Sequence, residues 1–312
     1  MHFALYLGVA ILLLLLFSGF YTFWAACVRR KELPWLDESI KSTHYGKYYS
    51  IIHSSDAFLR ENNAQDAWIE SVDGLKLHAH WIPAENPVGT VVLAHGYRST
   101  KLVDFGAVYR IYHNLRMNIL VPDQRSHGQS EGKVITFGVK ESRDMQGWIQ
   151  WHNQHNPNLP VMLSGLSMGA STMLYLADKE LPDNVKGIIA DCGFTSPWNI
   201  ISSVFRNVTH LPAGPSLWIA DMFARLFAGF HLREEDTRRS LQNSRIPVLM
   251  VHGTGDTFVP CDMTREAFAV CAEPKELLLV EGAEHGVSFL AEPDRYVETV
   301  KNFICTAMGV CL

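Results

Sequence analysis

The chain has 312 residues, of which 47% are hydrophobic, 11% aromatic and 19% charged, and its net charge at pH 7 is −5. This apolar content is enough for a large core and excludes an intrinsically disordered protein. A negative charge without any basic stripe argues against a nucleic-acid-binding protein. The length fits one large α/β domain with an additional segment, or two small domains.

The N-terminus is a long uncharged apolar segment. No charged residue occurs from Phe3 to Val28, a stretch longer than the ~20 residues that a helix needs to cross the hydrocarbon layer. Aromatic residues gather at 20–24 and three basic residues follow at 29–31, a pattern typical of a membrane–water interface with a cytoplasmic positive flank. We therefore expect a single-pass transmembrane anchor at residues 1–28, with the rest of the chain in the cytoplasm.

Two alternatives for this segment stay open. The residues Trp24-Ala25-Ala26-Cys27 loosely resemble a lipoprotein cleavage site, although Trp is unusual where an aliphatic residue is expected and no basic residue precedes the apolar run. A signal anchor with an external domain is the other alternative, and the charge asymmetry argues against it.

Residues 29–65 are mixed and polar, and we expect a juxtamembrane linker there. From residue 66 the pattern changes to that of a folded domain, which we expect to extend over 66–312. Alternating residues around Asp73-Gly74 predict a β-hairpin with a tight turn. Short runs that are apolar at every position then alternate with helical stretches, as in strands buried on both faces of a parallel sheet. These runs end at Gly96, Asp123, Gly165, Asp191, Gly253 and Gly282.

A hairpin followed by repeated strand–helix units predicts an α/β fold with a mostly parallel, eight-stranded sheet and helices on both faces. Nearly fifty residues rich in large apolar groups, 197–245, interrupt this alternation. An insertion of this length in a compact domain is usually functional. We expect a helical cap over the carboxyl edge of the sheet, where ligands bind in open α/β folds.

The pattern G-x-S-x-G occurs twice, centred on Ser130 and on Ser167. A nucleophile elbow needs a buried strand that leads directly into the motif and a helix that leaves it. The run Val161-Met162-Leu163 leads into the second motif, and a helical pattern follows it. The first motif has polar residues before it and a β-branched stretch after it. The sequence therefore predicts Ser167 as the nucleophile and a structural loop around Ser130.

A serine nucleophile needs a base, and an acid to orient that base. In α/β-hydrolase folds the chain order is Ser, acid, His. His285, in "EGAEHG", follows directly after an apolar run and is the predicted base, whereas His252 lies inside a strand. Asp256, in the loop after "VLMVHGTG", is the predicted acid, with Asp191 as its competitor.

Asp123 precedes Ser167 in the chain, and we expect its carboxylate to hold its own loop through backbone N–H groups. The tetrahedral intermediate needs two hydrogen-bond donors for its oxyanion. We expect the amides of Met168, directly after the nucleophile, and of Tyr97, after "LAHG", to supply them.

The chain resembles the α/β-hydrolase superfamily over residues 67–310. The resemblance is carried by "AHGYRST", "PDQRSHGQSEG", "SGLSMGA", "HGTGDTFVP" and "EGAEHG", in that order. The second of these looks like the family's loop after the fourth strand, commonly D-x-R-G-x-G-x-S, with Ser126 standing where the family often has Gly. This assigns the motif at Ser130 to structure.

More narrowly, the anchor and motifs are similar to membrane-anchored bacterial serine hydrolases and to the serine aminopeptidase-like or acylglycerol-lipase-like branch. The resemblance implies hydrolysis of an ester, thioester or amide through an acyl-enzyme, without a cofactor. The apolar cap favours a hydrophobic acyl ester, the expectation for a carboxylesterase or lipase. The alternatives are an aminopeptidase-like amidase, for which residues 234–236 offer carboxylates to an α-ammonium group, and a non-catalytic binding module of the same fold.

Metal binding is a weaker hypothesis. The pairs His78/His80 and His152/His155 have suggestive spacings but lack Cys or acidic company in the required pattern, so we expect surface or packing residues. The six cysteines form no C-x-x-C pair. Asn207-Val208-Thr209 would be a glycosylation acceptor only in a secreted eukaryotic protein. The expected partners are a small ester or short peptide-like substrate and the membrane.

Overall fold

The computed structural model describes residues 2–30, 46, 49–50, 54–272 and 274–310. Much of the segment expected to be a linker, at 31–45, 47–48 and 51–53, lies outside the described residues.

The domain is built on one sheet of eight strands in the order β1-β2-β4-β3-β5-β6-β7-β8. β1 and β2 form the predicted antiparallel hairpin, β2 also pairs antiparallel with β4, and all other pairs are parallel. This confirms the prediction of a mostly parallel, eight-stranded sheet. The strands are β1 Gln65–Glu70, β2 Lys76–Ile82, β3 Gly89–Ala94, β4 Met117–Pro122, β5 Val161–Leu166, β6 Val185–Asp191, β7 Val248–Gly253 and β8 Lys275–Val280.

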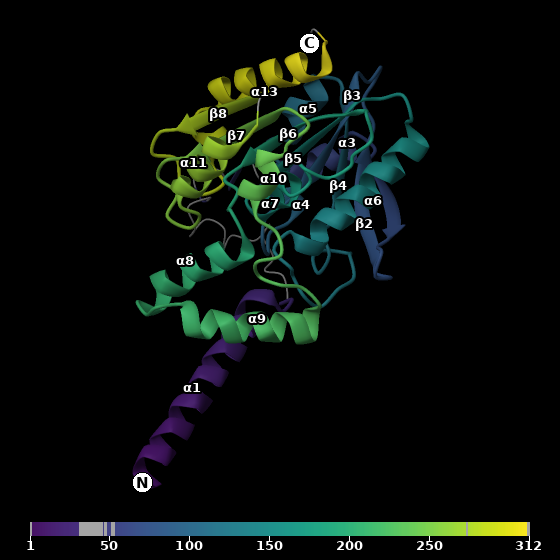
Figure 1. The fold of residues 1–312 in the computed structure, drawn as a ribbon. Helices are drawn as coiled ribbons and strands as arrows, with labels where there is room; N and C mark the ends of the chain where they lie inside the picture. Colours follow the sequence, from purple (N-terminus) through teal and green to yellow (C-terminus); the bar gives the residue numbers. More distant parts are fainter. Residues whose placement is uncertain (1, 31–45, 47–48, 51–53, 273, 311–312) are drawn as a thin grey trace.

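Helices cover both faces of this sheet (Figure 1). One core cluster joins α3, α4, α5 and α13 to the sheet, and a second joins α6, α7, α10 and α11 to the opposite face. Every residue of β3, β4, β5 and β7 is buried, which explains why these runs are apolar at consecutive positions. The helices are α3 Ser55–Glu61, α4 Lys101–Phe105, α5 Tyr109–Asn114, α6 Val139–His155, α7 Met168–Leu174, α10 Thr237–Gln242, α11 Cys261–Val270, α12 Ser288–Ala291 and α13 Pro293–Met308.

The range 197–245, predicted as a cap, contains a helical hairpin at one end of the molecule, whereas its last helix, α10, packs on the sheet. The hairpin consists of α8, Pro197–Thr209, and α9, Gly214–Ala228, and Pro near the start of each helix suits a first turn that has no use for its N–H. Both helices belong to a third core cluster, which also contains Phe23 of the N-terminal helix and Met168 beside Ser167. The cap is therefore packed onto the segment that carries the predicted nucleophile.

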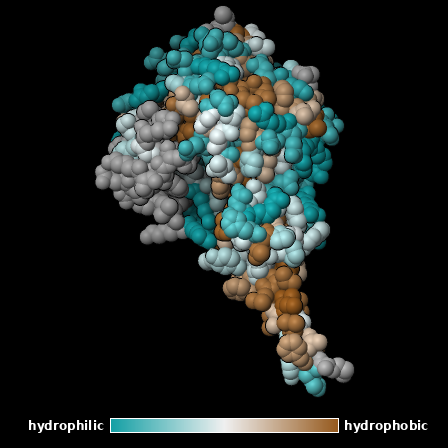
Figure 2. All heavy atoms as spheres, turned by 90° about the vertical axis from the view of Figure 1, so that its left-hand side faces the viewer, coloured by the Kyte–Doolittle hydropathy of each residue, from teal (hydrophilic) through white to brown (hydrophobic). Residues whose placement is uncertain are grey.

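The N-terminal helix α1, His2–Cys27, protrudes from the body beside α8 and α9 (Figure 1). It is long and apolar enough to cross a membrane, and a signal sequence would share this length and composition. Its carboxyl half packs against α9: Ser18 Oγ lies 2.8 Å from Ser216 Oγ, and a Cβ on Gly19 would overlap the side chain of Ile219. Figure 2 shows the apolar surface of the protruding helix in brown.

Candidate active site

Ser167 occupies a sharp turn between β5, which ends at Leu166, and α7, which begins at Met168. Its backbone has φ +55° and ψ −116°, a conformation that costs a non-glycine residue roughly 1–3 kcal/mol. The flanking glycines make the turn possible: a Cβ on Gly165 would overlap the backbone of Gly169, and a Cβ on Gly169 would overlap the carbonyl of Ala94. The motif therefore has the strand, the strained serine and the helix of a nucleophile elbow.

The structure brings Ser167, His285 and Asp256 together from three separate loops at the carboxyl edge of the sheet. Ser167 Oγ lies 2.9 Å from His285 Nε2, and His285 Nδ1 lies 2.6 Å from Asp256 Oδ2. With Nδ1–H donating to the carboxylate, Nε2 is left to accept the hydroxyl proton of Ser167. These are the contacts that a serine, its base and an orienting acid require.

Asp256 is fixed by several donors besides His285. Its Oδ1 accepts hydrogen bonds from the amides of Phe258 and Val259, at 2.9 and 2.8 Å, and His252 Nε2 lies 3.2 Å from Oδ2. Burial alone would raise the pKa of Asp256, but the hydrogen bonds from His252 and His285 outweigh it and hold the pKa well below its ordinary value. The carboxylate is therefore ionised at neutral pH.

The contact of His252 with the site was not predicted from the sequence, which placed this residue inside a strand. It is fully buried, and Thr264 Oγ1 lies 2.6 Å from its Nδ1. One feature of the sequence could have indicated this contact. His252 stands four residues before Asp256, and the strand ends between them, so that the chain can turn and bring the two side chains together.

Asp191, the competing acid, lies at the end of β6. Its Oδ1 accepts a hydrogen bond from Ser288 Oγ at 3.0 Å, and its carbonyl accepts the amide of Ser167 at 2.8 Å. Burial raises the pKa of Asp191 to about 6, against the opposing effect of the Ser288 hydroxyl. Asp191 thus stabilises the backbone of the elbow through its carbonyl group.

The two predicted oxyanion donors lie on rigid supports. The amide of Met168 is at the first position of α7, and in the part of the chain that the structure describes neither it nor the amide of Tyr97 has an internal acceptor. The loop that carries Tyr97 is held on both sides: the amide of Gly96 donates to Asp104 at 2.5 Å, and the amide of Arg98 donates to His127 Nε2 at 3.0 Å. Burial lowers the pKa of His127 to about 3, so its imidazole is neutral and can accept.

The other motif forms a buried loop, as predicted. Ser130 Oγ donates to the carbonyl of Asp123 at 2.6 Å and accepts the amide of His78 at 2.9 Å. The carboxylate of Asp123 accepts the amide of Gln129 at 3.2 Å, which confirms that it holds its own loop. Ser130 is only 1% exposed, so its hydroxyl is engaged and inaccessible.

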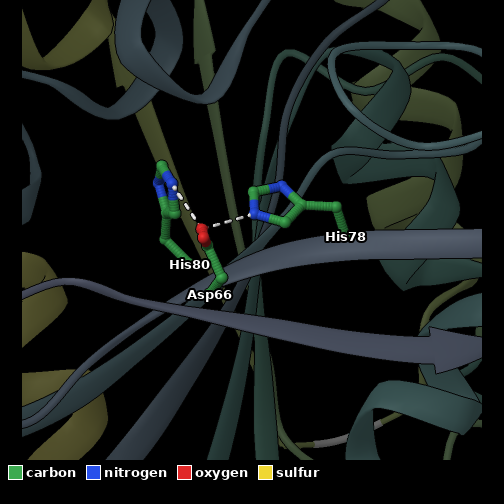
Figure 3. A group of neighbouring side chains, drawn as sticks. All are labelled: Asp66, His78 and His80. Atoms are coloured by element: carbon green, nitrogen blue, oxygen red, sulfur yellow. Dashed lines mark hydrogen bonds and ion pairs between the residues drawn. The ribbon is translucent and has the colours of Figure 1, made fainter.

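Asp66, His78 and His80 form a group of possible metal ligands on the β1–β2 hairpin (Figure 3). Asp66 Oδ1 lies 2.9 Å from His78 Nε2 and 3.5 Å from His80 Nε2, so the carboxylate already fills the space between the two rings. His78 Nδ1 lies 2.8 Å from Asp123 Oδ2, and the ammonium of Lys101 lies 2.9 Å from the same oxygen. A cation at this place would compete with the charge of Lys101, and the group is better described as packing support for the 123–132 loop.

The second histidine pair does not converge on one point. His152 is buried, with Nε2 2.8 Å from Thr90 Oγ1, whereas the ring of His155 stacks on Trp151 with 4.2 Å between centroids. Both were expected to be surface or packing residues, and both are.

Ser167 lies at the inner end of a pocket of about 490 Å³, a volume in the range of small-molecule sites. The wall is mostly apolar and comes from α1, from α8 and from the loops around the serine. Its residues are Ser18, Tyr21, Thr22, Ala25, Ala26, Tyr97, Arg98, Phe137, Ser167, Phe194, Ile200, Ile201, Val204, Phe205, Val208, Thr209, Leu211 and Phe258.

The sheet order, the elbow and the cap define an α/β-hydrolase fold. Residues 89–214 match a family model for the alpha/beta hydrolase fold, and residues 163–290 match a model named Serine hydrolase (FSH1). The chain belongs to the α/β-hydrolase superfamily, which confirms the resemblance drawn from its motifs.

Individual proteins are similar to this chain over most of its length. YqkD of Bacillus subtilis is 29% identical over 237 residues, covering 76% of this chain and 77% of YqkD. YfhR of Escherichia coli K12 is 23% identical over 256 residues, covering 79% of this chain and 82% of YfhR. Among solved structures, the Pyrococcus furiosus esterase Pf2001 superposes with a TM-score of 0.65 at 22% identity, over 80% of this chain and 95% of the esterase. At this identity the likeness shows a shared fold.

Proposed function

We propose that this protein is a serine hydrolase that cleaves an ester of a hydrophobic acyl group through an acyl-enzyme. The observation that carries the proposal is the hydrogen-bonded series Ser167–His285–Asp256 at the inner end of an apolar pocket. Thioesters and amides would react by the same steps.

The residues have the following roles in the proposed reaction. Ser167 Oγ attacks the carbonyl carbon and passes its proton to His285 Nε2, and Asp256 stabilises the imidazolium that forms. The carbonyl oxygen becomes an oxyanion and accepts hydrogen bonds from the amides of Met168 and Tyr97, each of which contributes about 2.7–4 kcal/mol to lowering the barrier. His285 then protonates the leaving alcohol. Water, deprotonated by the same imidazole, releases the carboxylic acid and restores Ser167.

The pocket supports an acyl ester over an aminopeptidase substrate. The three carboxylates considered for an α-ammonium group all have cationic partners outside the pocket. Glu234 pairs with Arg143 at 2.7 Å, Glu235 with Lys179 at 3.3 Å, and Asp236 with Arg238 at 2.7 Å. No Asp or Glu occurs among the described residues that line the pocket beside Ser167.

The substrate class can be tested with p-nitrophenyl esters of increasing chain length, measured alongside amino-acyl p-nitroanilides, with Ser167→Ala as the blank. We expect kcat/KM to rise with acyl length and to exceed that of every amide by at least tenfold. A preference for amino-acyl amides would contradict the esterase assignment. Absence of hydrolysis of any ester would favour the binding-module alternative.

We also propose that α1 is a single-pass anchor with the hydrolase domain in the cytoplasm. The basic residues Arg29 and Arg30 follow the helix directly, as the positive-inside rule requires. Protease treatment of intact and of opened cells measures this orientation: the domain should be degraded only after opening. Degradation in intact cells would place the domain outside.

A further inference from the structure

The apolar helix α1 is part of the pocket that holds Ser167. Five of its residues, spaced along its carboxyl half, line that pocket opposite α8. They are Ser18, Tyr21, Thr22, Ala25 and Ala26. The same helix that could cross the membrane therefore also forms one wall of the candidate active site.

The end of α1 is also bonded to the loop that carries an oxyanion donor. Tyr97 Oη donates to the carbonyl of Ala26 at 2.7 Å, and Arg98 Nη2 donates to the carbonyls of Ala25 and Val28 at 2.8 and 3.0 Å. Since α1 ends there, its last carbonyls have no helical partner and are satisfied by this loop instead. These bonds fix α1 against the reaction centre.

The pocket is buried at Ser167 and exposed at its other end. Ser167 is 6% exposed, whereas Val208, in the last turn of α8, and Leu211, between α8 and α9, are 74% and 60% exposed. Tyr21 of α1, which lines the same pocket, is 54% exposed. The opening therefore lies between α1 and the α8–α9 turn.

Apolar surface continues from this opening onto neighbouring helices. Trp218, Met222, Leu226 and Phe227 of α9 are all exposed, and so are most of the large side chains of α1 up to Phe20. Figure 2 shows that the protruding part of α1 is mostly apolar. Soluble proteins rarely expose apolar patches of this extent, and such patches mark interaction sites. Because α1 itself is the candidate membrane span, we take the bilayer as the partner that covers this apolar patch.

We infer that the substrate is an acyl-ester lipid of the bilayer, which reaches Ser167 laterally along α1 through the opening at Val208 and Leu211. This inference rests on the proposed hydrolase function. The acyl chain would lie against α1 and α8, with its carbonyl carbon at Ser167 and its methyl end toward the bilayer. Each CH₂ group gains about 0.8 kcal/mol on leaving water but little on passing from lipid into an apolar pocket. A route from the bilayer therefore avoids exposing the chain to water.

The route can be tested with the full-length protein in phosphatidylcholine vesicles that contain dioleoylglycerol, with released oleic acid as the readout. In one arm the protein and the dioleoylglycerol share a vesicle. In the other arm the protein is in vesicles of ether lipid that contain no phosphatidylcholine, and these are mixed with separate vesicles that contain the substrate. We expect oleic acid release to be at least tenfold faster in the shared vesicles, and to vanish in Ser167→Ala. Equal rates in the two arms would overturn lateral entry.

The wall formed by α1 is tested by Ala25→Phe, which places a ring in the pocket. The matched control is Ala10→Phe, on the exposed part of the same helix. We expect Ala25→Phe to lower the ratio of kcat/KM for p-nitrophenyl palmitate to that for p-nitrophenyl butyrate at least tenfold, and Ala10→Phe to leave the ratio unchanged. An unchanged ratio in a folded Ala25→Phe protein would remove α1 from the acyl site.

A second variant guards against misfolding of the first. Leu211→Asp puts a charge at the exposed opening, and Val72→Asp, at a site 93% exposed on the β1–β2 turn, is its control. We expect only Leu211→Asp to lower oleic acid release from shared vesicles, again by at least tenfold. If the wild-type protein hydrolyses butyrate but shows none of these differences, the lateral route fails and the hydrolase proposal stands. If it hydrolyses no ester in any form, both fail.

Discussion

Two segments of this chain share the pattern G-x-S-x-G but have opposite environments. At Ser167 the backbone is strained, a strand enters and a helix leaves, and the hydroxyl faces His285 and an apolar pocket. At Ser130 the hydroxyl is held between the carbonyl of Asp123 and the amide of His78. A serine is made available for chemistry by the backbone around it, and the motif letters alone do not decide this.

The glycines of the two motifs differ in backbone conformation. Gly165 and Gly169 permit close contact of backbones across the elbow. Gly128 and Gly132 have φ +50° and +120°, backbone conformations that side chains disfavour, and a Cβ on them would also overlap Asp123 and Ser126, respectively. The glycines thus allow close packing in both motifs, and those around Ser130 also set the direction of the chain.

The largest expected difference between the two motifs is in activity. Ser167→Ala should lower kcat for a p-nitrophenyl ester by about 10⁴–10⁶-fold, the loss typical of removing a serine nucleophile. Ser130→Ala should retain activity within about threefold but lower the free energy of unfolding by about 1–3 kcal/mol, because a buried carbonyl and a buried amide lose their partner. Steady-state kinetics and urea unfolding measure the two effects. Inactivity of a folded Ser130→Ala protein, together with activity in Ser167→Ala, would reverse the assignment.

The two candidate acids should differ almost as strongly. Asp256→Asn should lower kcat by about 10⁴-fold, because an amide can donate to His285 and favour the wrong tautomer. Asp191→Asn should stay within about tenfold of the wild type, since its carboxylate is held by Ser288. Both variants are compared at saturating ester, with circular dichroism as the control for folding. The reverse order of effects would make Asp191 the acid.

A smaller effect is expected at His252, which we treat as a positioning residue. His252→Phe removes the contact with Asp256 Oδ2 and should lower kcat by about 10–100-fold with little change in KM, because a hydrogen bond to a charged group is worth about 1.5–3 kcal/mol. His252→Gln keeps a donor and should recover part of the loss. Equal kcat in the wild type and His252→Phe would show that Asp256 is held by its other donors alone.

The smallest effect concerns stability and pH. Burial raises the pKa of Asp191 from 3.8 to about 6, so between these values the folded protein holds a proton that the unfolded chain has released. The contribution of Asp191 to stability is therefore complete at low pH and decreases as the pH rises to about 6. Asp191→Asn should raise Tm by about 2–4 °C at pH 8 and by less at pH 4.5. A larger gain at pH 4.5 would contradict this sign.

The fold and the residues of the candidate site were predictable because both depend on local patterns. Strands buried on both faces require consecutive apolar residues, and parallel strands bring the loops of Ser167, Asp256 and His285 to one edge. The nucleophile elbow was predictable because its packing allows only glycine at positions 165 and 169.

The remaining features depend on contacts between distant segments. The apolar character of α1 predicted a membrane span but is nearly uniform around the helix, so no face indicated that Ala25 lines a pocket. The sequence of the cap predicted helices but not that α9 packs against α1 through Ser18 and Ser216. Likewise, the contact of His252 with Asp256 depends on how the loop after β7 folds back.

The most direct test of the central claim is labelling of the full-length protein by a fluorophosphonate, followed by mass spectrometry of its peptides. We predict one phosphonylated residue, Ser167, with labelling lost in Ser167→Ala and reduced at least a thousandfold in rate in His285→Ala. Labelling of Ser130, or undiminished labelling of His285→Ala, would contradict the claim that Ser167 is a nucleophile activated by His285.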